Sequence, residues 1–174
     1  ITTLLLIDVI YEFGMAWLSV PGVIMAVAAS IYTAFLFAQA KGRDLWQSSL
    51  SPVQMFLHTV IAGTVVLTLI DNDSISFTHP VLIFMLWLNL LMNVIELNIP
   101  HGSQDEKRAV KLMKMGKYGR VMKIALVISG IIPLMILHIF DSVMLINICG
   151  IMAVAGNYLT EFVRIRVAQL IPLS

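Results

Sequence analysis

Five long apolar stretches, separated by short polar connections, make up most of the chain. Each is close to the roughly 20 residues that a helix needs to cross the hydrocarbon core of a bilayer. A proline or a charged residue stands at four of the five starts, where a helix can begin without losing a needed N–H. We therefore predict membrane-spanning helices over about residues 21–40, 52–70, 80–97, 120–140 and 143–163.

The composition supports this prediction. Of the 174 residues, 59% are hydrophobic and only 12% are charged, and the mean hydropathy is +0.94. A water-soluble domain carries about twice that share of charged residues. The predicted fold class is an all-α transmembrane helical bundle over residues 21–174. Residues 1–20 precede it on the outer side, either as an interfacial segment, since Asp8 and Glu12 share a helix face, or as the end of a loop.

The basic residues predict the orientation in the membrane. All 11 lysines and arginines fall on one side of the predicted helices. Lys41 and Arg43 lie in the first connection, seven more lie in or beside residues 101–119, and Arg164 and Arg166 follow the fifth helix. Positively charged connections normally face the cytoplasm. We expect a multi-pass protein of the inner (cytoplasmic) membrane, with the basic connections and the C-terminus in the cytoplasm.

The third connection alternates lysines with Val110, Leu112, Met113 and Met115. Such a pattern suits a short helix lying on anionic lipid headgroups. The alternative is a solvated loop that only sets the topology. Nucleic-acid binding is not expected, because Tyr118 is the sole aromatic residue available there for stacking on bases.

A polar stripe runs down the third predicted helix. At about 100° per residue, Asn89, Asn93 and Glu96 fall within about 60° of one another. Ionisable groups inside a bilayer normally face the interior of the bundle or a hydrated cavity, and they often mark a proton path. Gln54 and His58 form a matching pair on the second helix. These five residues are the predicted intramembrane proton route.

Simpler roles compete with this interpretation. Further polar residues occur on the other helices: Ser30, Tyr32, Thr33, Gln39, Ser129, His138, Asn147, Asn157 and Glu161. Amide side chains between membrane helices often only hold the helices together, at roughly 0.6–2 kcal/mol each. His58 is open to three roles: a haem ligand, a proton relay or a structural donor. We expect neither haem nor metal, because no second histidine lies at its depth, and Cys149 fits a buried apolar position.

Several motifs resemble the NrfD/PsrC family of membrane subunits from polysulfide and nitrite reductase systems. Residues 31–53 match a Tyr-Thr-Gly-Phe-Leu-Leu segment followed by a polar turn and a Ser/Asn-Pro entry into the next helix. The matching residues are Tyr32, Thr33, Phe35, Leu36, Trp46, Ser49, Leu50 and Pro52. Ala34 stands where the family usually has glycine, and Ser51 intervenes before the proline.

Three more motifs follow in the family's order. Glu96 precedes Pro100, His101 and an acidic residue, as in the large membrane subunits of alternative complex III. A Gly-Ile-Ile-Pro turn spans residues 130–133, and Val-Ala-Gln spans residues 167–169.

The resemblance implies a specific role in electron transfer. Family members exchange electrons between membrane quinone or quinol and a partner iron-sulfur protein, and hold no redox cofactor themselves. Their two four-helix bundles lie side by side. The present chain is similar to the last helix of the first bundle followed by the whole second bundle. The resemblance makes Tyr32 the candidate quinone-binding residue, with a tyrosine that packs between helices as the alternative, and Pro100 with His101 matches the family's loop motif.

We therefore expect an integral membrane subunit of a quinone-linked respiratory oxidoreductase complex. Its partners would be an iron-sulfur subunit, a catalytic subunit, quinone and the lipid bilayer, and the chain itself would contain no catalytic residue. Two alternatives remain. A secondary transporter or channel fragment predicts inverted repeats and broken helices near the middle of the membrane, whereas a purely structural anchor leaves the polar stripe unexplained.

Overall fold

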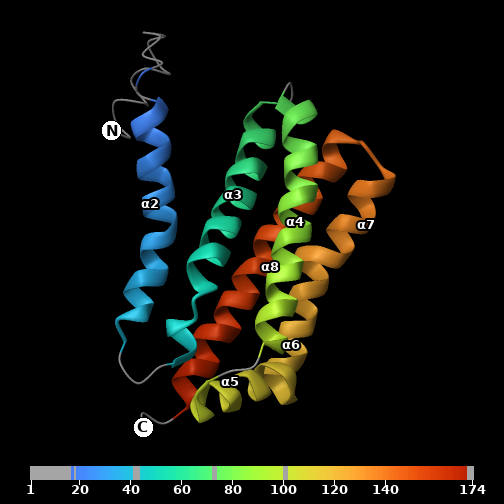
Figure 1. The fold of residues 1–174 in the computed structure, drawn as a ribbon. Helices are drawn as coiled ribbons and strands as arrows, with labels where there is room; N and C mark the ends of the chain where they lie inside the picture. Colours follow the sequence, from blue (N-terminus) through green and yellow to red (C-terminus); the bar gives the residue numbers. More distant parts are fainter. Residues whose placement is uncertain (1–16, 18, 41–43, 72–73, 100–101, 172–174) are drawn as a thin grey trace.

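The computed structural model describes Trp17 and residues 19–40, 44–71, 74–99 and 102–171. Almost all of them are helical, and none of these residues lies in a strand. The helices are, in chain order, α2 (Ser19–Ala38), a 3₁₀ turn (Asp44–Gln47), α3 (Ser51–Ile70), α4 (Ile75–Asn98), α5 (Gln104–Lys114), α6 (Gly116–Leu126), a π-helical turn (Val127–Ile131), α7 (Ile132–Ile139) and α8 (Val143–Leu170) (Figure 1).

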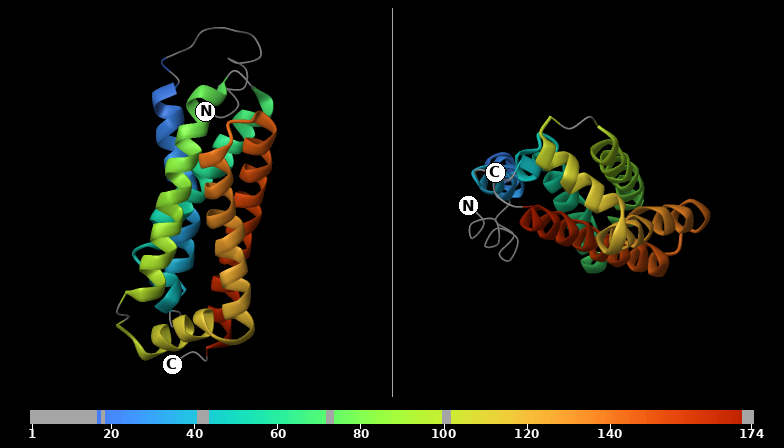
Figure 2. Two further views of the ribbon diagram at one scale, coloured as in Figure 1. Left: turned by 90° about the vertical axis from the view of Figure 1, so that its right-hand side faces the viewer. Right: turned by 90° about the horizontal axis from the view of Figure 1, so that it is seen from below.

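The predicted all-α class and the five membrane-spanning helices are confirmed. Helices α2, α3, α4 and α8 are each long and apolar enough to cross a bilayer. The fifth span runs from Gly116 to Ile139, because α6, the π-helical turn and α7 follow one another as one long helix. Helix α5 lies across the end of the bundle that also holds the C-terminus (Figures 1 and 2).

Helix α2 stands apart from the other spans. Helices α3, α4, α6–α7 and α8 pack together, whereas α2 lies along the outside next to α3 (Figure 2). Only 6% of the α2 span is buried, against 28–39% for the other four. The residues it leaves exposed are mostly apolar. Among the described residues, the packed bundle is therefore the four-helix unit of α3, α4, α6–α7 and α8.

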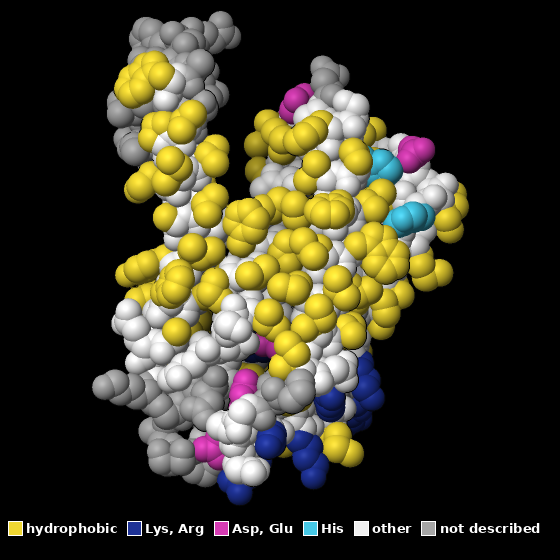
Figure 3. All heavy atoms as spheres, in the orientation of Figure 1, with side chains coloured by type: hydrophobic (Ala, Val, Ile, Leu, Met, Phe, Trp, Pro, Cys, Tyr) yellow, Lys and Arg dark blue, Asp and Glu magenta, His cyan; other side chains and the backbone are white. Residues whose placement is uncertain are grey.

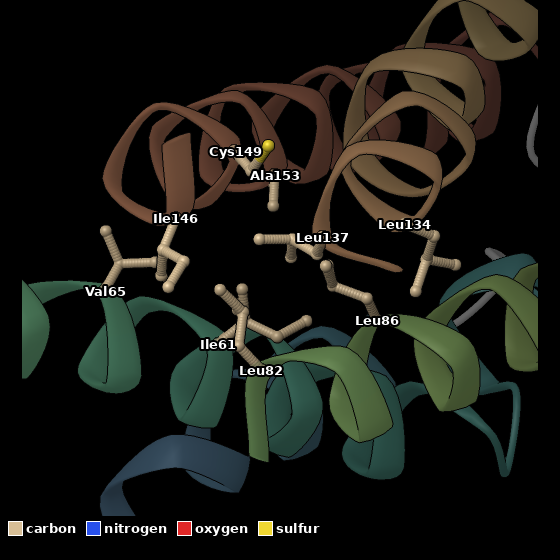
Figure 4. Packing of buried hydrophobic residues seen from close by; sticks show 9 residues of the cluster. All are labelled: Ile61, Val65, Leu82, Leu86, Leu134, Leu137, Ile146, Cys149 and Ala153. Atoms are coloured by element: carbon tan, nitrogen blue, oxygen red, sulfur yellow. The ribbon is translucent and has the colours of Figure 1, made fainter. Parts of the chain in front are cut away.

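Two apolar clusters hold this unit together. The upper one combines side chains of α3, α4, α7 and α8, and Ile61, Leu82 and Leu86 are fully buried within it (Figure 4). The lower cluster joins α5, α6 and α8 with Leu45 of the 3₁₀ turn. Burying a side chain such as Leu86 is worth about 1.5–3 kcal/mol when the alternative is water. Inside a bilayer, close packing of these surfaces replaces that driving force.

The ends of two helices differ from those predicted. Helix α4 begins at Ile75 rather than near Pro80, which lies inside the helix. Proline removes only one hydrogen bond there, in the second turn. Helix α8 was expected to end near Val163, but it continues to Leu170. The prediction that Arg164 and Arg166 follow the fifth helix is wrong, because both lie within α8.

The third connection contains a helix, α5, in agreement with one of the two expectations. The Ser103 hydroxyl accepts a hydrogen bond from the backbone N–H of Glu106 at 3.0 Å and caps its first turn. Its apolar side, with Ala109, Val110 and Met113, packs into the lower apolar cluster, and its expected position on lipid headgroups stays a prediction. The lysines and Arg108 lie on the opposite side and remain exposed.

The basic residues gather at one end of the molecule, whereas acidic residues lie at both ends, with Asp105 and Glu106 on α5. The described lysines and arginines lie at the end that carries α5, with the exception of Arg164 (Figure 3). Asp71 and Asp141 lie at the other end, where a ring nitrogen of His79 is 3.6 Å from the Asp141 carboxylate. Lys41 and Arg43 fall outside the described residues, as do residues 1–16. This distribution agrees with the expected position of the described basic residues on one side of the helices.

The π-helical turn and α8 approach each other without intervening side chains. A methyl group added at Gly156 would lie 2.5 Å from the backbone nitrogen of Ser129 in that turn. Small residues at such crossings let membrane helices pack backbone to backbone. Pro133, one turn further on, cannot donate a backbone hydrogen bond, which favours an irregular helix at this point. The close approach fixes the depth of α8 relative to α6.

Replacing Gly156 by alanine tests this contact, because the added methyl group forces α8 away from Ser129. We expect Gly156→Ala to lower the free energy of unfolding by about 1–3 kcal/mol, the usual cost of overpacking. Gly63→Ala on α3 is the matched control, since a methyl group there has no neighbour within 4 Å. Thermal unfolding of the purified protein measures both. Equal melting temperatures for Gly156→Ala and the wild type would show that the helices do not touch here.

Candidate functional site

The predicted polar stripe faces the interior of the bundle. Asn89 and Asn93 are each 1% exposed, and Glu96 is 3% exposed. Gln54 of α3 lies opposite them and is completely buried. Its amide nitrogen donates a hydrogen bond to the Glu96 carboxylate at 2.8 Å. The stripe is therefore shielded from lipid, as the periodicity predicted.

Arg164 of α8 occupies the centre of this site. Its guanidinium forms an ion pair with Glu96 and donates a hydrogen bond to the side-chain oxygen of Gln54. It also donates to Asn93 at 3.3 Å and to Glu161 at 3.2 Å. With 7% of its surface exposed, the residue is buried. One arginine thus connects side chains of α3, α4 and α8.

A second group of polar side chains lies one turn further from the α5 end. The amide nitrogen of Asn89 donates to the side-chain oxygen of Asn157 at 2.8 Å. The oxygen of Asn89 lies 3.1 Å from Nε2 of His58, whose Nδ1 lies 3.4 Å from the Glu161 carboxylate. Glu161 bridges the two groups, because the same oxygen also accepts from Arg164. The buried network is continuous from His58 to Glu96.

The network forms a polar layer between the two apolar clusters. Ile61, Leu86 and Ala153 of the upper cluster lie one turn above it on α3, α4 and α8. Val163 and Val167 of the lower cluster flank its other side. Low polarity above and below strengthens each hydrogen bond in the layer. It also makes any unpaired charge in the layer costly.

Two spaces adjoin the network. A small cavity of about 20 Å³ is lined by Glu96, Glu161 and Arg164, with Trp46 and Met55 among its other walls. Such a volume holds about one water molecule. The Nε–H of Arg164 is buried and has no hydrogen-bond acceptor among the described residues. A water in this cavity would connect the two carboxylates.

The second space is a groove of about 720 Å³ between α2, α3 and α8. His58, Asn157 and Glu161 line it on one side, and Ser30 and Thr33 line it on α2. The remaining walls are mostly apolar: Ala29, Met55, Thr59, Ala62, Gly63, Val66, Val154 and Tyr158. The polar network therefore reaches an open groove at the level of the membrane interior.

The remaining predicted residues lie elsewhere. Tyr32 is 60% exposed on α2 and is not among the residues that line the groove. Pro100 and His101 lie outside the described residues. His79 lies near the start of α4 and His138 near the end of α7, away from the network. Among the residues that the structure describes, no three His, Cys, Asp or Glu side chains are grouped closely enough to hold a metal ion.

Sequence reasoning missed Arg164 and left Glu161 and Asn157 outside the route. A signal for all three was present. Asn157, Glu161 and Arg164 follow one another with the same spacing as the stripe on α4, four residues and then three. The positive charge of Arg164 indicates the cytoplasmic side, and the predicted fifth helix therefore ends before this residue. Extending the periodicity by one turn places Arg164 on the same helix face as Asn157 and Glu161.

Comparison of the chain with protein-family models, with curated proteins and with solved structures gave no match.

Removing the charge of Arg164 tests its role in the site. We expect Arg164→Gln to cost about 3–5 kcal/mol of unfolding free energy, because Glu96 and Glu161 then lose their buried counter-charge. Arg166→Gln is the matched control two residues along the same helix, where the side chain is exposed beside the Phe162 ring. Thermal unfolding of the purified protein measures both variants. Similar melting temperatures for the two would show that Arg164 does not bind the helices together.

Proposed function

We propose that the chain is an integral membrane subunit of a quinone-linked respiratory oxidoreductase complex. In this role it exchanges electrons between quinone or quinol and a partner iron-sulfur protein, and it provides a polar route for protons inside the membrane. The observation that supports this proposal best is the continuous buried network from His58 to Glu96. A bundle that served only as an anchor would have no need of three ionisable side chains and an arginine in its interior.

Quinone chemistry needs such a route. Oxidation of a quinol releases two electrons and two protons, and the protons must leave the apolar interior through groups that accept and donate them. Among the residues of the network, His58 and Glu161 are able to do this, whereas Glu96 is the buried counter-charge of Arg164. The asparagines and Gln54 carry no proton themselves, but they orient the titratable groups and the water between them. The water-sized cavity beside Glu96 and Glu161 provides the place for that water.

The position of α2 suits the architecture that the sequence resemblance implies. If α2 is the last helix of a first bundle, its exposed apolar face would pack against the remaining helices of that bundle. Tyr32 lies on α2 and is 60% exposed, so it would then contribute to the quinone pocket from the opposite side. The groove beside His58 would lie at the junction of the two bundles.

In this proposal the basic residues indicate how the subunit is oriented in the membrane. The end that carries α5 and the C-terminus would face the cytoplasm, because it holds nearly all the described positive charges. Glu96 is two residues from the end of α4 at this side of the membrane. Protons carried by water in the cavity beside Glu96 would therefore exchange with the cytoplasmic side.

A transporter or channel fragment is the alternative from another class. It predicts discontinuous helices that unwind near a substrate site. The π-helical turn is the irregularity that the structure shows within a described span, and it continues the helix rather than unwinding it. This feature favours the electron-transfer proposal over transport.

Purification of the tagged chain from its native membrane tests the proposed function. We expect it to copurify with a protein whose broad iron-sulfur absorption in the visible range is bleached when quinol is added. A quinone-analogue inhibitor should prevent this bleaching, which provides the control. A chain that purifies alone, or with a partner that lacks iron-sulfur absorption and does not respond to quinol, would contradict the proposal.

A further inference from the structure

The His58–Glu161 pair differs from the Arg164–Glu96 pair in its surroundings. The side chains of Arg164 and Glu96 are 8% and 4% exposed, and their contact is closed off from the groove. Those of His58 and Glu161 are 14% and 19% exposed, and both line the groove between α2, α3 and α8. One pair is sealed in the interior, and the other lies where protons can enter and leave.

The direction of the hydrogen bonds can be followed outward from Arg164. A guanidinium group only donates hydrogen bonds. The atom of Asn93 that faces it at 3.3 Å is therefore the side-chain oxygen. The amide nitrogen of Asn93 consequently points away from Arg164 and donates to the backbone and side-chain oxygens of Asn89, at 2.8 and 3.2 Å.

The same reasoning fixes the protonation of one nitrogen of His58. Because Asn89 presents its oxygen to Asn93, it presents the same oxygen to Nε2 of His58 at 3.1 Å. An amide oxygen only accepts, so Nε2 of His58 must carry a hydrogen. The amide nitrogen of Asn89 is directed at Asn157, whose oxygen accepts it.

What remains is Nδ1 of His58, which faces a carboxylate oxygen of Glu161 at 3.4 Å. With Nε2 protonated, a neutral imidazole has only a lone pair at Nδ1. An ionised Glu161 would place a second acceptor opposite that lone pair. We propose that His58 and Glu161 hold one exchangeable proton between them and form the proton-binding site of this bundle, whereas Arg164 and Glu96 form its fixed ion pair.

The charges of the neighbouring groups are consistent with this assignment. Helix α8 contributes Arg164 beside Glu161, α4 contributes Glu96, and α2 contributes only the neutral Ser30 and Thr33 to the groove. With the proton bound, the four charged or titratable groups of the network sum to zero charge. Moving the proton from Nδ1 to the carboxylate leaves the total unchanged. Releasing it leaves a neutral His58 and an ionised Glu161, which the hydrogen bond from Arg164 still stabilises.

The groove offers the exchange path. Asn157 lines the groove beside this pair, and its amide nitrogen is buried with no hydrogen-bond acceptor among the described residues. An uncompensated buried donor of this kind costs about 1–3 kcal/mol. A water molecule in the groove would stand close to Glu161, which lines it. It would thus be placed to take the proton from the pair or to return it.

This inference rests on the proposed function, because it names the residues at which the proposed proton route holds its proton. The test, however, reads the resting protein and requires no quinone turnover. The protein is purified with its native partners, placed in lipid bilayers at neutral pH and labelled with ¹⁵N-histidine. Signals of His58 are assigned by their loss in His58→Gln. Infrared spectroscopy in H₂O and D₂O follows the Glu161 carboxyl group, assigned by its loss in Glu161→Gln.

We expect Nε2 of His58 to be protonated in the wild type, together with either its Nδ1 or the Glu161 carboxyl group. In Glu161→Gln an amide N–H faces Nδ1, so Nδ1 should be unprotonated while Nε2 keeps its hydrogen. Tyr158→Phe is the control, because Tyr158 lines the same groove but is 71% exposed, and it should leave every signal unchanged. An unprotonated Nε2 would overturn the proposal. So would a bare Nδ1 beside an ionised Glu161, or an Nδ1 that stays protonated in Glu161→Gln.

Discussion

The ion pair between Arg164 and Glu96 is the interaction on which the arrangement of α3, α4 and α8 depends. An arginine within a membrane span costs several kcal/mol unless its charge is matched and its N–H groups find acceptors. Here the matching charge comes from another helix, and further acceptors come from Gln54 and Asn93. The three helices therefore have to meet at one depth and in one rotation. Apolar packing alone would tolerate small shifts of one helix along another.

This constraint also organises the chemistry of the site. Because Arg164 only donates hydrogen bonds, it determines which way each amide beyond it is turned, as far as His58. Protonation of Glu96 would leave the buried guanidinium without its counter-charge, which makes Glu96 a poor carrier of protons. Glu161 is less enclosed and shares its oxygen between Arg164 and His58. The same arginine thus separates a structural carboxylate from one that can exchange protons.

Much of the fold followed from the sequence because the membrane imposes simple rules. Helix length, apolar composition and the spacing of Asn89, Asn93 and Glu96 predicted five spans and the buried face of α4, and both predictions are confirmed. The sequence pattern did not identify Arg164 as the partner of Glu96 in the same way. The rule that places basic residues outside the hydrocarbon core does not predict a buried arginine whose charge is balanced by a carboxylate on another helix. Which helices lie side by side is a tertiary property, and only that property makes Arg164 a residue of the interior.

A distance between Arg164 and Glu96 in the intact protein would test this arrangement most directly. Solid-state magnetic resonance on protein labelled with ¹³C in the glutamate carboxyl groups and ¹⁵N in the arginine guanidinium groups can measure it. We expect a dipolar contact corresponding to about 4 Å, the separation that an N–H···O bond imposes on these two atoms, and we expect Glu96→Gln to remove it. A wild-type spectrum without a contact that depends on Glu96 would contradict the central role of this ion pair.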